Sequence, residues 1–398
     1  MAKIINLKGL KPLKDIKNIV EKSSSLDVNK IKETFENGTE RVKKSFEPDI
    51  QVMMLGARRV GKTSILASMI GEFNKITSET NLVLTKEKGG KAIDDALINM
   101  KGYFAGNPKA YEYVSKMDTN STSGFEFFDL ELSIANKTAL RSRKIRFWDC
   151  AGEWITNYAN EEKIAEKIEK SDVVIIAIDS VLLMENKGQY NHQNAVENVT
   201  NFIKKHMAPS DSVNNHKMVL FVPLKCEKYY WQNIDKDGMY YGKRMAQLNK
   251  AVKDAYEDLF VFFAKENNRP YFDVAIMPIL TIGGIEFYEF TCNKDAFKVL
   301  TEDMRYAYSI QPEFNPQYCE MPLIYTLLFE YWKIKNEYES KTFGKNGKKK
   351  MTSYIREWIQ DKKNLAKDTD YMKEMEKLKN IISNNKDAYL EIVQGRMM

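Results

Sequence analysis

Short apolar runs alternate with longer amphipathic stretches along most of this 398-residue chain. The runs are rich in β-branched residues, which predicts strands buried on both faces. The stretches between them repeat their apolar positions every three or four residues, which predicts helices. Strands that alternate with helices in this way indicate an α/β fold, a mostly parallel sheet between two layers of helices. The predicted parallel strands are 51–55, 171–179, 217–224 and 273–280.

Two more strands are predicted in the first half of the chain, at 125–136 (FEFFDLELSIAN) and 144–149 (KIRFWD). Only a short polar loop separates them, so they form a hairpin. The stretch 86–117 is predicted to be mostly helical, with a break at 106–108. Further helices are predicted at 63–75, 153–170, 194–206, 244–266 and 321–338.

The two ends of the chain are basic although the net charge is only +6. Residues 1–48 hold eleven Lys or Arg against seven Asp or Glu, and residues 341–398 hold fourteen against eight. Both ends are predicted to be helical extensions, 1–47 and 341–398, of a central domain at 48–340. A basic end can contact anionic lipid, nucleic acid or an acidic partner, although a solvated helix face is its usual meaning. Nucleic acid is disfavoured here, and peripheral membrane contact stays open.

The composition is that of a globular protein, with 43% hydrophobic and 29% charged residues. The four cysteines are far apart and form no CxxC pair, so neither a zinc knuckle nor a disulfide framework is indicated. The first residues lack the apolar core of a secretory signal, and no stretch has the uncharged length of a membrane span. We therefore expect a cytoplasmic protein.

The candidate chemistry begins with the sequence GARRVGKTS, which follows the first predicted strand and precedes a predicted helix. It matches the phosphate-loop pattern GxxxxGK[ST]. In such a loop, glycines let backbone amides curl around phosphate oxygens, and the lysine reaches the terminal phosphates. The threonine hydroxyl suits Mg²⁺. The residues expected to contact the nucleotide here are Gly56, Ala57, Arg58, Arg59, Val60, Gly61, Lys62, Thr63 and Ser64.

A second motif, DCAG, follows the strand KIRFWD. Asp149 ends that strand, where a carboxylate near a phosphate loop can hold Mg²⁺ together with Thr63. The amide of Gly152 can contact the terminal phosphate. The two motifs therefore predict a nucleotide site with bound magnesium.

In order and spacing these motifs resemble those of the Ras-like P-loop GTPases of the TRAFAC class, over roughly residues 49–338. The resemblance implies a three-layer G domain that binds GTP or GDP and signals its state to an effector or adaptor protein. It identifies Lys225 and Glu227 of LKCE as base-reading residues, and Thr281 of TIGG as the late loop that touches the base. It also implies that a mobile threonine, Thr122 or otherwise Thr119, contacts Mg²⁺.

The LKCE motif departs from the family pattern [NT]KxD at Leu224, where Asn or Thr is usual, and at Glu227, which is one methylene longer than Asp. A narrower similarity links LKCEKYY, TIGG and CEMPLIYTLLF to bacterial double-GTPase and conflict-system GTPase domains.

Hydrolysis depends on the residues around the terminal phosphate. Glu153 stands where many Ras-like enzymes carry glutamine, and its charge opposes the developing negative oxygens, so unaided turnover is expected to be slow. Arg58 or Arg59 could stabilise that charge, pair with Glu153, or face a partner. The candidate catalytic residues are Gly152, Glu153, Arg58 and Lys62.

Two other functions stay open on the sequence alone. One is a P-loop ATPase or kinase, against which LKCE and the motif order argue. The other is an adaptor that binds nucleotide without turnover, which Glu153 and Leu224 favour.

Overall fold

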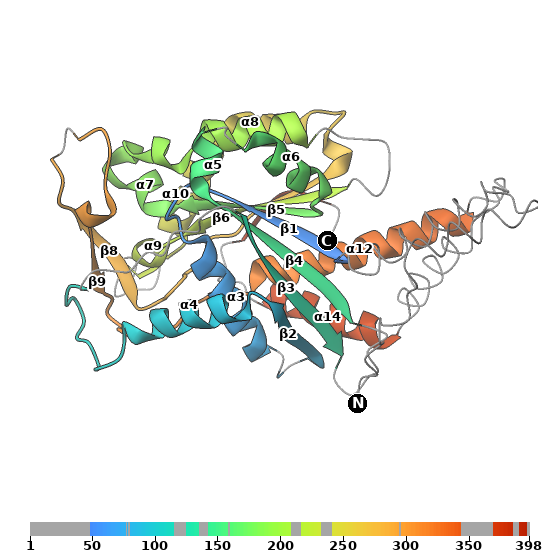
Figure 1. Ribbon diagram of the computed structural model, residues 1–398, viewed down its shortest axis with the longest axis horizontal. Coiled ribbons are helices and arrows are strands. Elements are labelled where there is room, and N and C mark those ends of the chain that lie inside the picture. Colours follow the sequence, from blue (N-terminus) through green and yellow to red (C-terminus); the bar gives the residue numbers. More distant parts are fainter. Residues whose placement is uncertain are drawn as a thin grey trace, which may run out of the picture. The chain divides into compact units, whose positions relative to one another are not determined.

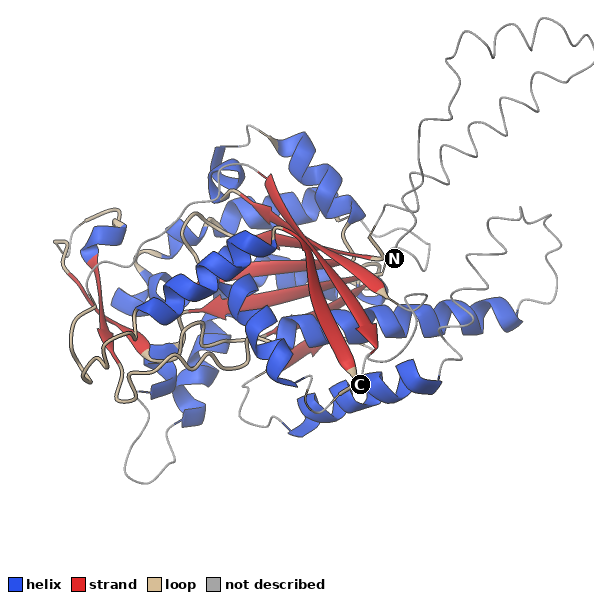
Figure 2. Cartoon of the chain, turned by 60° about the horizontal axis from the view of Figure 1, so that its bottom comes forward, coloured by secondary structure: helices blue, strands red, loops and turns tan. Residues whose placement is uncertain are grey.

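An eight-stranded sheet forms the centre of the structure (Figures 1 and 2). The structure is a computed structural model, and its described elements all belong to one unit, residues 49–398. The residues that it describes are 48–76, 78, 80–114, 125–134, 142–157, 160–207, 216–231, 241–293, 296–343, 369–384 and 390–395.

The strands lie in the order β10-β7-β6-β5-β1-β4-β3-β2. The five from β7 to β4 are parallel, whereas β10, β3 and β2 run antiparallel to their neighbours. The α/β prediction and the predicted β3–β4 hairpin are therefore confirmed. The strands are β1 (Ile50–Leu55), β2 (Leu82–Lys88), β3 (Phe125–Ile134), β4 (Arg143–Cys150), β5 (Val173–Asp179), β6 (Lys217–Leu224), β7 (Phe272–Ile276) and β10 (Glu391–Gln394).

Helices cover both faces of the sheet because the central strands are apolar on both sides (Figure 2). On β1, Val52 and Met54 join one core, with α3 (Lys62–Ile76), α4 (Gly90–Gly102), α12 (Met321–Phe343) and α14 (Thr369–Asn384). Met53 and Leu55 join the other. That second core contains α5 (Gly152–Asn157), α6 (Glu161–Lys170), α8 (Val196–His206), α10 (Tyr241–Ala255) and α11 (Glu257–Ala264).

Short helices connect the larger elements near the ends of the strands. They are α7 (Ser180–Met184), α9 (Glu227–Trp231) and the 3₁₀ turns η3 (Glu185–Gly188), η4 (Asn191–Asn194), η6 (Arg269–Tyr271) and η7 (Thr301–Asp303).

A second, small sheet consists of β8 (Ile285–Phe290) and β9 (Met304–Tyr308). Residues 111–114 run along its β9 edge. The amide of Tyr111 donates to the carbonyl of Tyr308 at 2.9 Å, and that of Val114 donates to the carbonyl of Tyr306 at 3.0 Å. The hairpin is thus fixed to the segment that follows α4.

Several predicted helices differ from the structure. Residues 86–88 are not helical, because Leu82 and Leu84 face the core and carry β2 as a strand alongside β3. Helix α4 covers only Gly90–Gly102, and residues 115–117 lie outside the described residues. The helices predicted at 153–170 and 244–266 are each two helices.

The last described part of the chain packs on the sheet and its helices. Tyr371, Met375 and Leu378 of α14 join the core, and β10 pairs with β7 at the sheet edge. Residues 1–47 lie outside the described residues, and the predicted divisions at 47 and 340 stay predictions. Within the described part of the chain, no helix has the length and apolar character needed to cross a bilayer.

Candidate functional site

The predicted motifs gather at one edge of the sheet, where its parallel strands end (Figure 1). The phosphate loop follows β1, and Asp149 lies near the end of β4. The residues Lys225 and Glu227 follow β6, and the TIGG loop comes shortly after β7. Ligands of open α/β sheets bind at this carboxyl edge.

The phosphate loop is a tight turn whose side chains face different ways. A Cβ on Gly56 would lie 2.7 Å from the carbonyl oxygen of Ala177, so only glycine fits between β1 and β5. Arg58 and Arg59 are exposed, whereas Lys62 is buried at the start of α3. The remaining loop residues Ala57 and Val60 are buried, and Gly61, Thr63 and Ser64 are half-buried.

The Lys62 ammonium lies inside the loop. It donates to the carbonyl oxygens of Gly56 at 3.0 Å and Ala57 at 3.1 Å. Burial lowers the pKa of Lys62, while the nearby Asp149 carboxylate and Cys150 oppose that shift. An anion beside this ammonium would remove part of the desolvation cost, which is the chemistry of a phosphate site.

Thr63 and Asp149 form the candidate magnesium pair. The Thr63 hydroxyl donates to Asp149 Oδ2 at 2.9 Å, and the carboxylate is fully buried. A hydroxyl and a carboxylate are the hard oxygen ligands that Mg²⁺ prefers, with phosphate and water completing its shell. No group of three or more His, Cys, Asp or Glu side chains converges as a metal site among the described residues. The pair therefore fits a magnesium ion that is bound together with a nucleotide.

The DCAG segment touches the phosphate loop directly. A Cβ on Gly152 would lie 2.1 Å from the amide nitrogen of Arg58 and 2.4 Å from the carbonyl carbon of Ala57. Beyond this contact, the Arg58 guanidinium pairs with the Glu153 carboxylate at 2.5 Å, with about half of each side chain exposed. The phosphate-loop and DCAG motifs therefore lie on one surface. Two of the predicted catalytic residues, Arg58 and Glu153, form an ion pair with each other there.

On the other side of the loop, Lys225 connects three elements. Its backbone is left-handed (φ 59°), and its ammonium forms an ion pair with Asp179 at the end of β5. It also donates to the carbonyl oxygen of Arg59 at 3.4 Å. Burial alone would lower the pKa of Lys225, but the Asp179 carboxylate and the Tyr306 hydroxyl raise it well above its ordinary value. The LKCE and phosphate loops are therefore linked by a charged lysine.

Glu227 is turned into the protein, where it caps the TIGG loop. The amides of Ile282 and Gly283 donate to its Oε1 at 2.9 Å and 3.2 Å. Burial raises the pKa of Glu227, and these amides oppose the rise. The loop is held on its other side by Ser68 of α3, whose hydroxyl donates to the carbonyl oxygen of Thr281 at 2.9 Å. Base reading by Glu227 and Thr281 stays a prediction.

Other functional candidates were missed by the sequence patterns or lie outside the structure. Asp179 forms the ion pair with Lys225, and its position at the end of a predicted strand was the one sequence signal for it. Glu286 of β8 is a half-buried carboxyl, and desolvation raises its pKa to about 7. The candidate mobile threonines Thr119 and Thr122 are outside the described residues.

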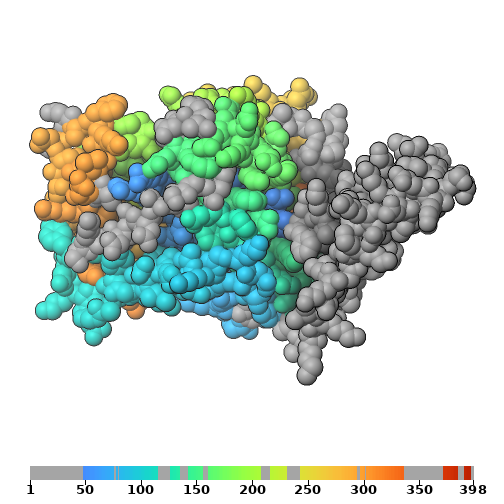
Figure 3. All heavy atoms as spheres, in the orientation of Figure 1, coloured from blue at the N-terminus to red at the C-terminus, as the bar shows by residue number. Residues whose placement is uncertain are grey.

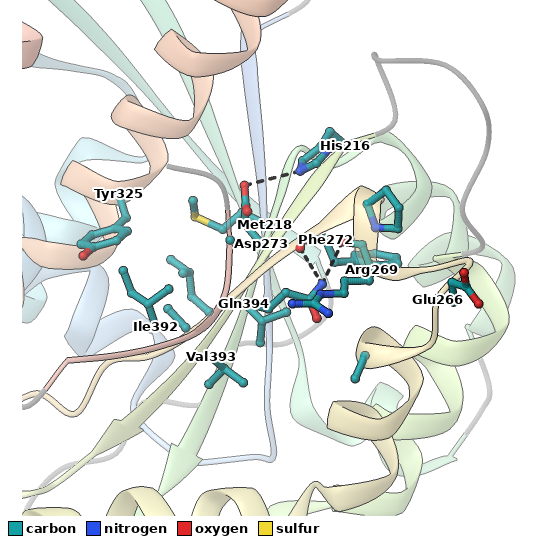
Figure 4. A pocket seen from close by; sticks show the side chains of 16 residues that line it. His216, Met218, Glu266, Arg269, Phe272, Asp273, Tyr325, Ile392, Val393 and Gln394 are labelled. Atoms are coloured by element: carbon teal, nitrogen blue, oxygen red, sulfur yellow. Dashed lines mark hydrogen bonds and ion pairs between the residues drawn. The ribbon is translucent and has the colours of Figure 1, made fainter. Parts of the chain in front are cut away.

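A cavity of about 890 Å³ lies away from these motifs, at the end of the sheet where β6 and β7 begin (Figure 4). The His216 imidazole and the Asp273 carboxylate face one another there at 3.5 Å. Ile392 and Gln394 of the neighbouring strand β10 also line it. None of the predicted nucleotide-binding residues lines this cavity.

One family model matches the part of the chain that carries the phosphate-loop, DCAG and LKCE motifs. The Double-GTPase 2 family model matches residues 50–228, from β1 to the LKCE motif. The chain carries a P-loop GTPase domain related to the double GTPases. This relationship supports GTP binding by the chain.

Other comparisons find more distant similarity or none. A solved structure of the Roco2 protein of Methanosarcina barkeri, a RocCORdC chain bound to GDP, is similar at 13% identity and a TM-score of 0.27. That similarity covers 85% of this chain and 67% of the Roco2 chain. No curated protein matches the sequence.

The contact at Gly152 gives a direct test of how the GTPase domain is assembled. Gly152→Ala should force the phosphate loop away from the DCAG segment and reduce the free energy of unfolding by about 1–3 kcal/mol. Nucleotide affinity should fall with it. Gly102→Ala is the matched control, since nothing lies within 4 Å of its added Cβ. If Gly152→Ala unfolded and bound nucleotide in the same way as the wild type, that result would contradict the contact.

Proposed function

We propose that this protein is a magnesium-dependent GTP-binding switch that hydrolyses GTP slowly and reports its nucleotide state to a partner protein. The observation that carries the proposal is the convergence at one sheet edge of the Lys62 ammonium, the Thr63–Asp149 pair and the Gly152 segment. These are the parts that a nucleoside triphosphate with magnesium requires, and they come from two neighbouring strands.

In this proposal each group has one task. Lys62 exchanges its contacts with the Gly56 and Ala57 carbonyls for the terminal phosphates, which compensate its buried charge. Thr63 and Asp149 hold Mg²⁺, which neutralises phosphate charge when it is bound. The Gly152 amide contacts the terminal phosphate, and Thr122 is proposed to close over it.

Guanine suits the contacts of Glu227 better than adenine does. Guanine offers N–H donors at positions 1 and 2 and an acceptor at O6. Oε1 of Glu227 accepts from Ile282 and Gly283, and the second oxygen of the carboxylate would accept the two guanine donors without release of those amides. Adenine has an acceptor at position 1 and a donor only at position 6, so it would offer the carboxylate no such donor pair. The stem of Lys225 would pack along the base.

Slow hydrolysis follows from the pair between Arg58 and Glu153. An ion pair this exposed contributes only about 0–1 kcal/mol, so the terminal phosphate can compete with Glu153 for the guanidinium. Arg58 would then stabilise the negative charge of the transferring phosphoryl group. Glu153 would accept a hydrogen bond from the attacking water, although its charge works against the reaction.

A nucleotide-binding adaptor without turnover is the second candidate. The closed Arg58–Glu153 pair favours it, because it keeps both predicted catalytic side chains away from a phosphate. A P-loop ATPase has less support, because adenine offers the Glu227 carboxylate no pair of N–H donors.

Removing the Lys62 ammonium tests phosphate binding. Lys62→Met should weaken GTP and GDP binding by about 100-fold, equivalent to the loss of a buried charge-assisted hydrogen bond of roughly 2.7 kcal/mol. Titration with and without Mg²⁺ measures this effect. Lys217→Met is the matched control. Lys217 is also a buried lysine that donates to backbone carbonyls, but it lies at the far end of the strands. Equal losses of nucleotide affinity in the two variants would rule out the phosphate role.

Glu227→Gln tests base selection. The glutamine oxygen can still accept from Ile282 and Gly283, so the loop should keep its shape. Its amide can donate to the 2-oxo group of xanthine but cannot accept both donors of guanine. We expect GDP affinity to fall by about tenfold or more relative to XDP affinity, measured by competition against labelled GDP. An unchanged GDP to XDP ratio would leave Glu227 as a loop cap without a part in base reading.

Turnover of bound GTP tests the Arg58–Glu153 pair. Glu153→Gln releases Arg58 and removes the opposing charge, so single-turnover hydrolysis should accelerate by about tenfold. Arg58→Ala in the same background should cancel that gain. Glu289→Gln, in a comparably exposed pair with Arg305, serves as control. Tight GTP binding with no phosphate release from wild type or Glu153→Gln would instead favour the adaptor.

A further inference from the structure

The LKCE motif has an apolar side chain at its first position, where the family that it resembles carries Asn or Thr. Leu224 is fully buried, and a Cβ on Gly61 would lie 3.5 Å from its Cδ1, so it packs against the phosphate loop. In the sheet, Leu224 of β6 lies opposite Asp179, the last residue of β5. A buried carboxylate therefore stands beside the apolar position, at the same level of the sheet.

The two oxygens of the Asp179 carboxylate have different partners. Its Oδ1 accepts from the amides of Val181 at 3.0 Å and Leu182 at 3.3 Å, and so caps the start of α7. Its Oδ2 forms the ion pair with the Lys225 ammonium. The same ammonium donates to the carbonyl oxygen of Arg59. Asp179 is therefore joined to the LKCE motif and, through Lys225, to the phosphate loop.

A buried asparagine holds the backbone of Asp179 on both sides. The amide of Asp179 donates to Asn194 Oδ1 at 2.8 Å, and Asn194 Nδ2 donates to the carbonyl oxygen of Asp179 at 3.2 Å. Asn194 ends the turn η4, and Tyr190, just before that turn, packs against Phe290 of β8 with ring centroids 5.0 Å apart. In Figure 3, the green surface of the residues that follow β5 lies beside the orange surface of the β8–β9 hairpin. The carboxylate is thus presented from a fixed support.

We infer that Asp179 is a positioning residue for the nucleotide base, because its ion pair orders the Lys225 stem before a purine packs along that stem. This inference rests on the proposed function. A lysine side chain has many rotamers, and ordering it during binding costs affinity. Its pair with a buried carboxylate removes that cost, since breaking the pair would leave a desolvated charge. Asp179 thus supplies from β5 the polar side chain that β6 lacks at Leu224.

The inference predicts a loss of affinity that is specific for the base. Asp179→Asn keeps an oxygen that can cap α7 but removes the charge that pairs with Lys225. It should weaken GDP binding by about fivefold, the cost of ordering one long side chain. Binding of inorganic tripolyphosphate, which lacks a base, should not weaken. Asp172→Asn is the matched control and should leave both affinities unchanged. Asp172 also pairs with a lysine, Lys333, and accepts from a backbone amide, but it lies at the opposite end of β5.

A double variant separates positioning from folding. In a Lys225→Met background the ammonium is absent, so adding Asp179→Asn should cause no further loss of GDP affinity. A further loss in the double variant would overturn the inference. Equal losses for GDP and tripolyphosphate would also overturn it, because they would give Asp179 a role in folding alone. If wild type binds both ligands and Asp179→Asn binds GDP like wild type, only this inference fails. If wild type binds neither ligand, the proposed function fails and the inference fails with it.

Discussion

The site depends on the parallel register between β1 and β4. Met54 lies opposite Asp149, so the carboxylate reaches the level of the phosphate loop that begins at Gly56. Thr63, one residue into α3, then meets Asp149, and the chain after β4 runs under the loop at Gly152. A slip of one residue would turn Asp149 toward the other face of the sheet and open that contact. Neither half of the site would keep its geometry alone.

The contacts on the base side of the site are harder to break than those on the phosphate side. On the base side, the Lys225–Asp179 pair is largely buried, and Glu227 is enclosed among backbone amides. Buried ion pairs and capped loops resist rearrangement, because breaking them leaves a desolvated charge. On the phosphate side, Arg58 and Glu153 form a pair that is about half exposed and separates at little cost.

Sequence patterns predicted what depends on local periodicity and on motif spacing. The parallel strands, the β3–β4 hairpin and the phosphate loop are each indicated by a pattern of residues that are close together in the sequence. Sequence patterns could not predict β2. Its sequence LVLTKEK has only two buried apolar positions, and it ends in charged residues that are followed by glycines. The ion pair between Lys225 and Asp179 joins residues 46 positions apart, and no spacing rule predicts such a pairing. The hydrogen bonds of Glu227 to Ile282 and Gly283 could not be predicted for the same reason, since these residues are also far apart in the sequence.

The loops of the site also share supports. Lys225 contacts the phosphate loop at the Arg59 carbonyl, and Ser68 of α3 holds the TIGG loop at Thr281. A base and a phosphate chain bound there would therefore brace the same helix from two sides. Of the contacts described here, the half-exposed Arg58–Glu153 pair beside Gly152 is the weakest, so a change in the phosphates would alter it first. Under the proposed function, the number of bound phosphates would therefore be read at this pair.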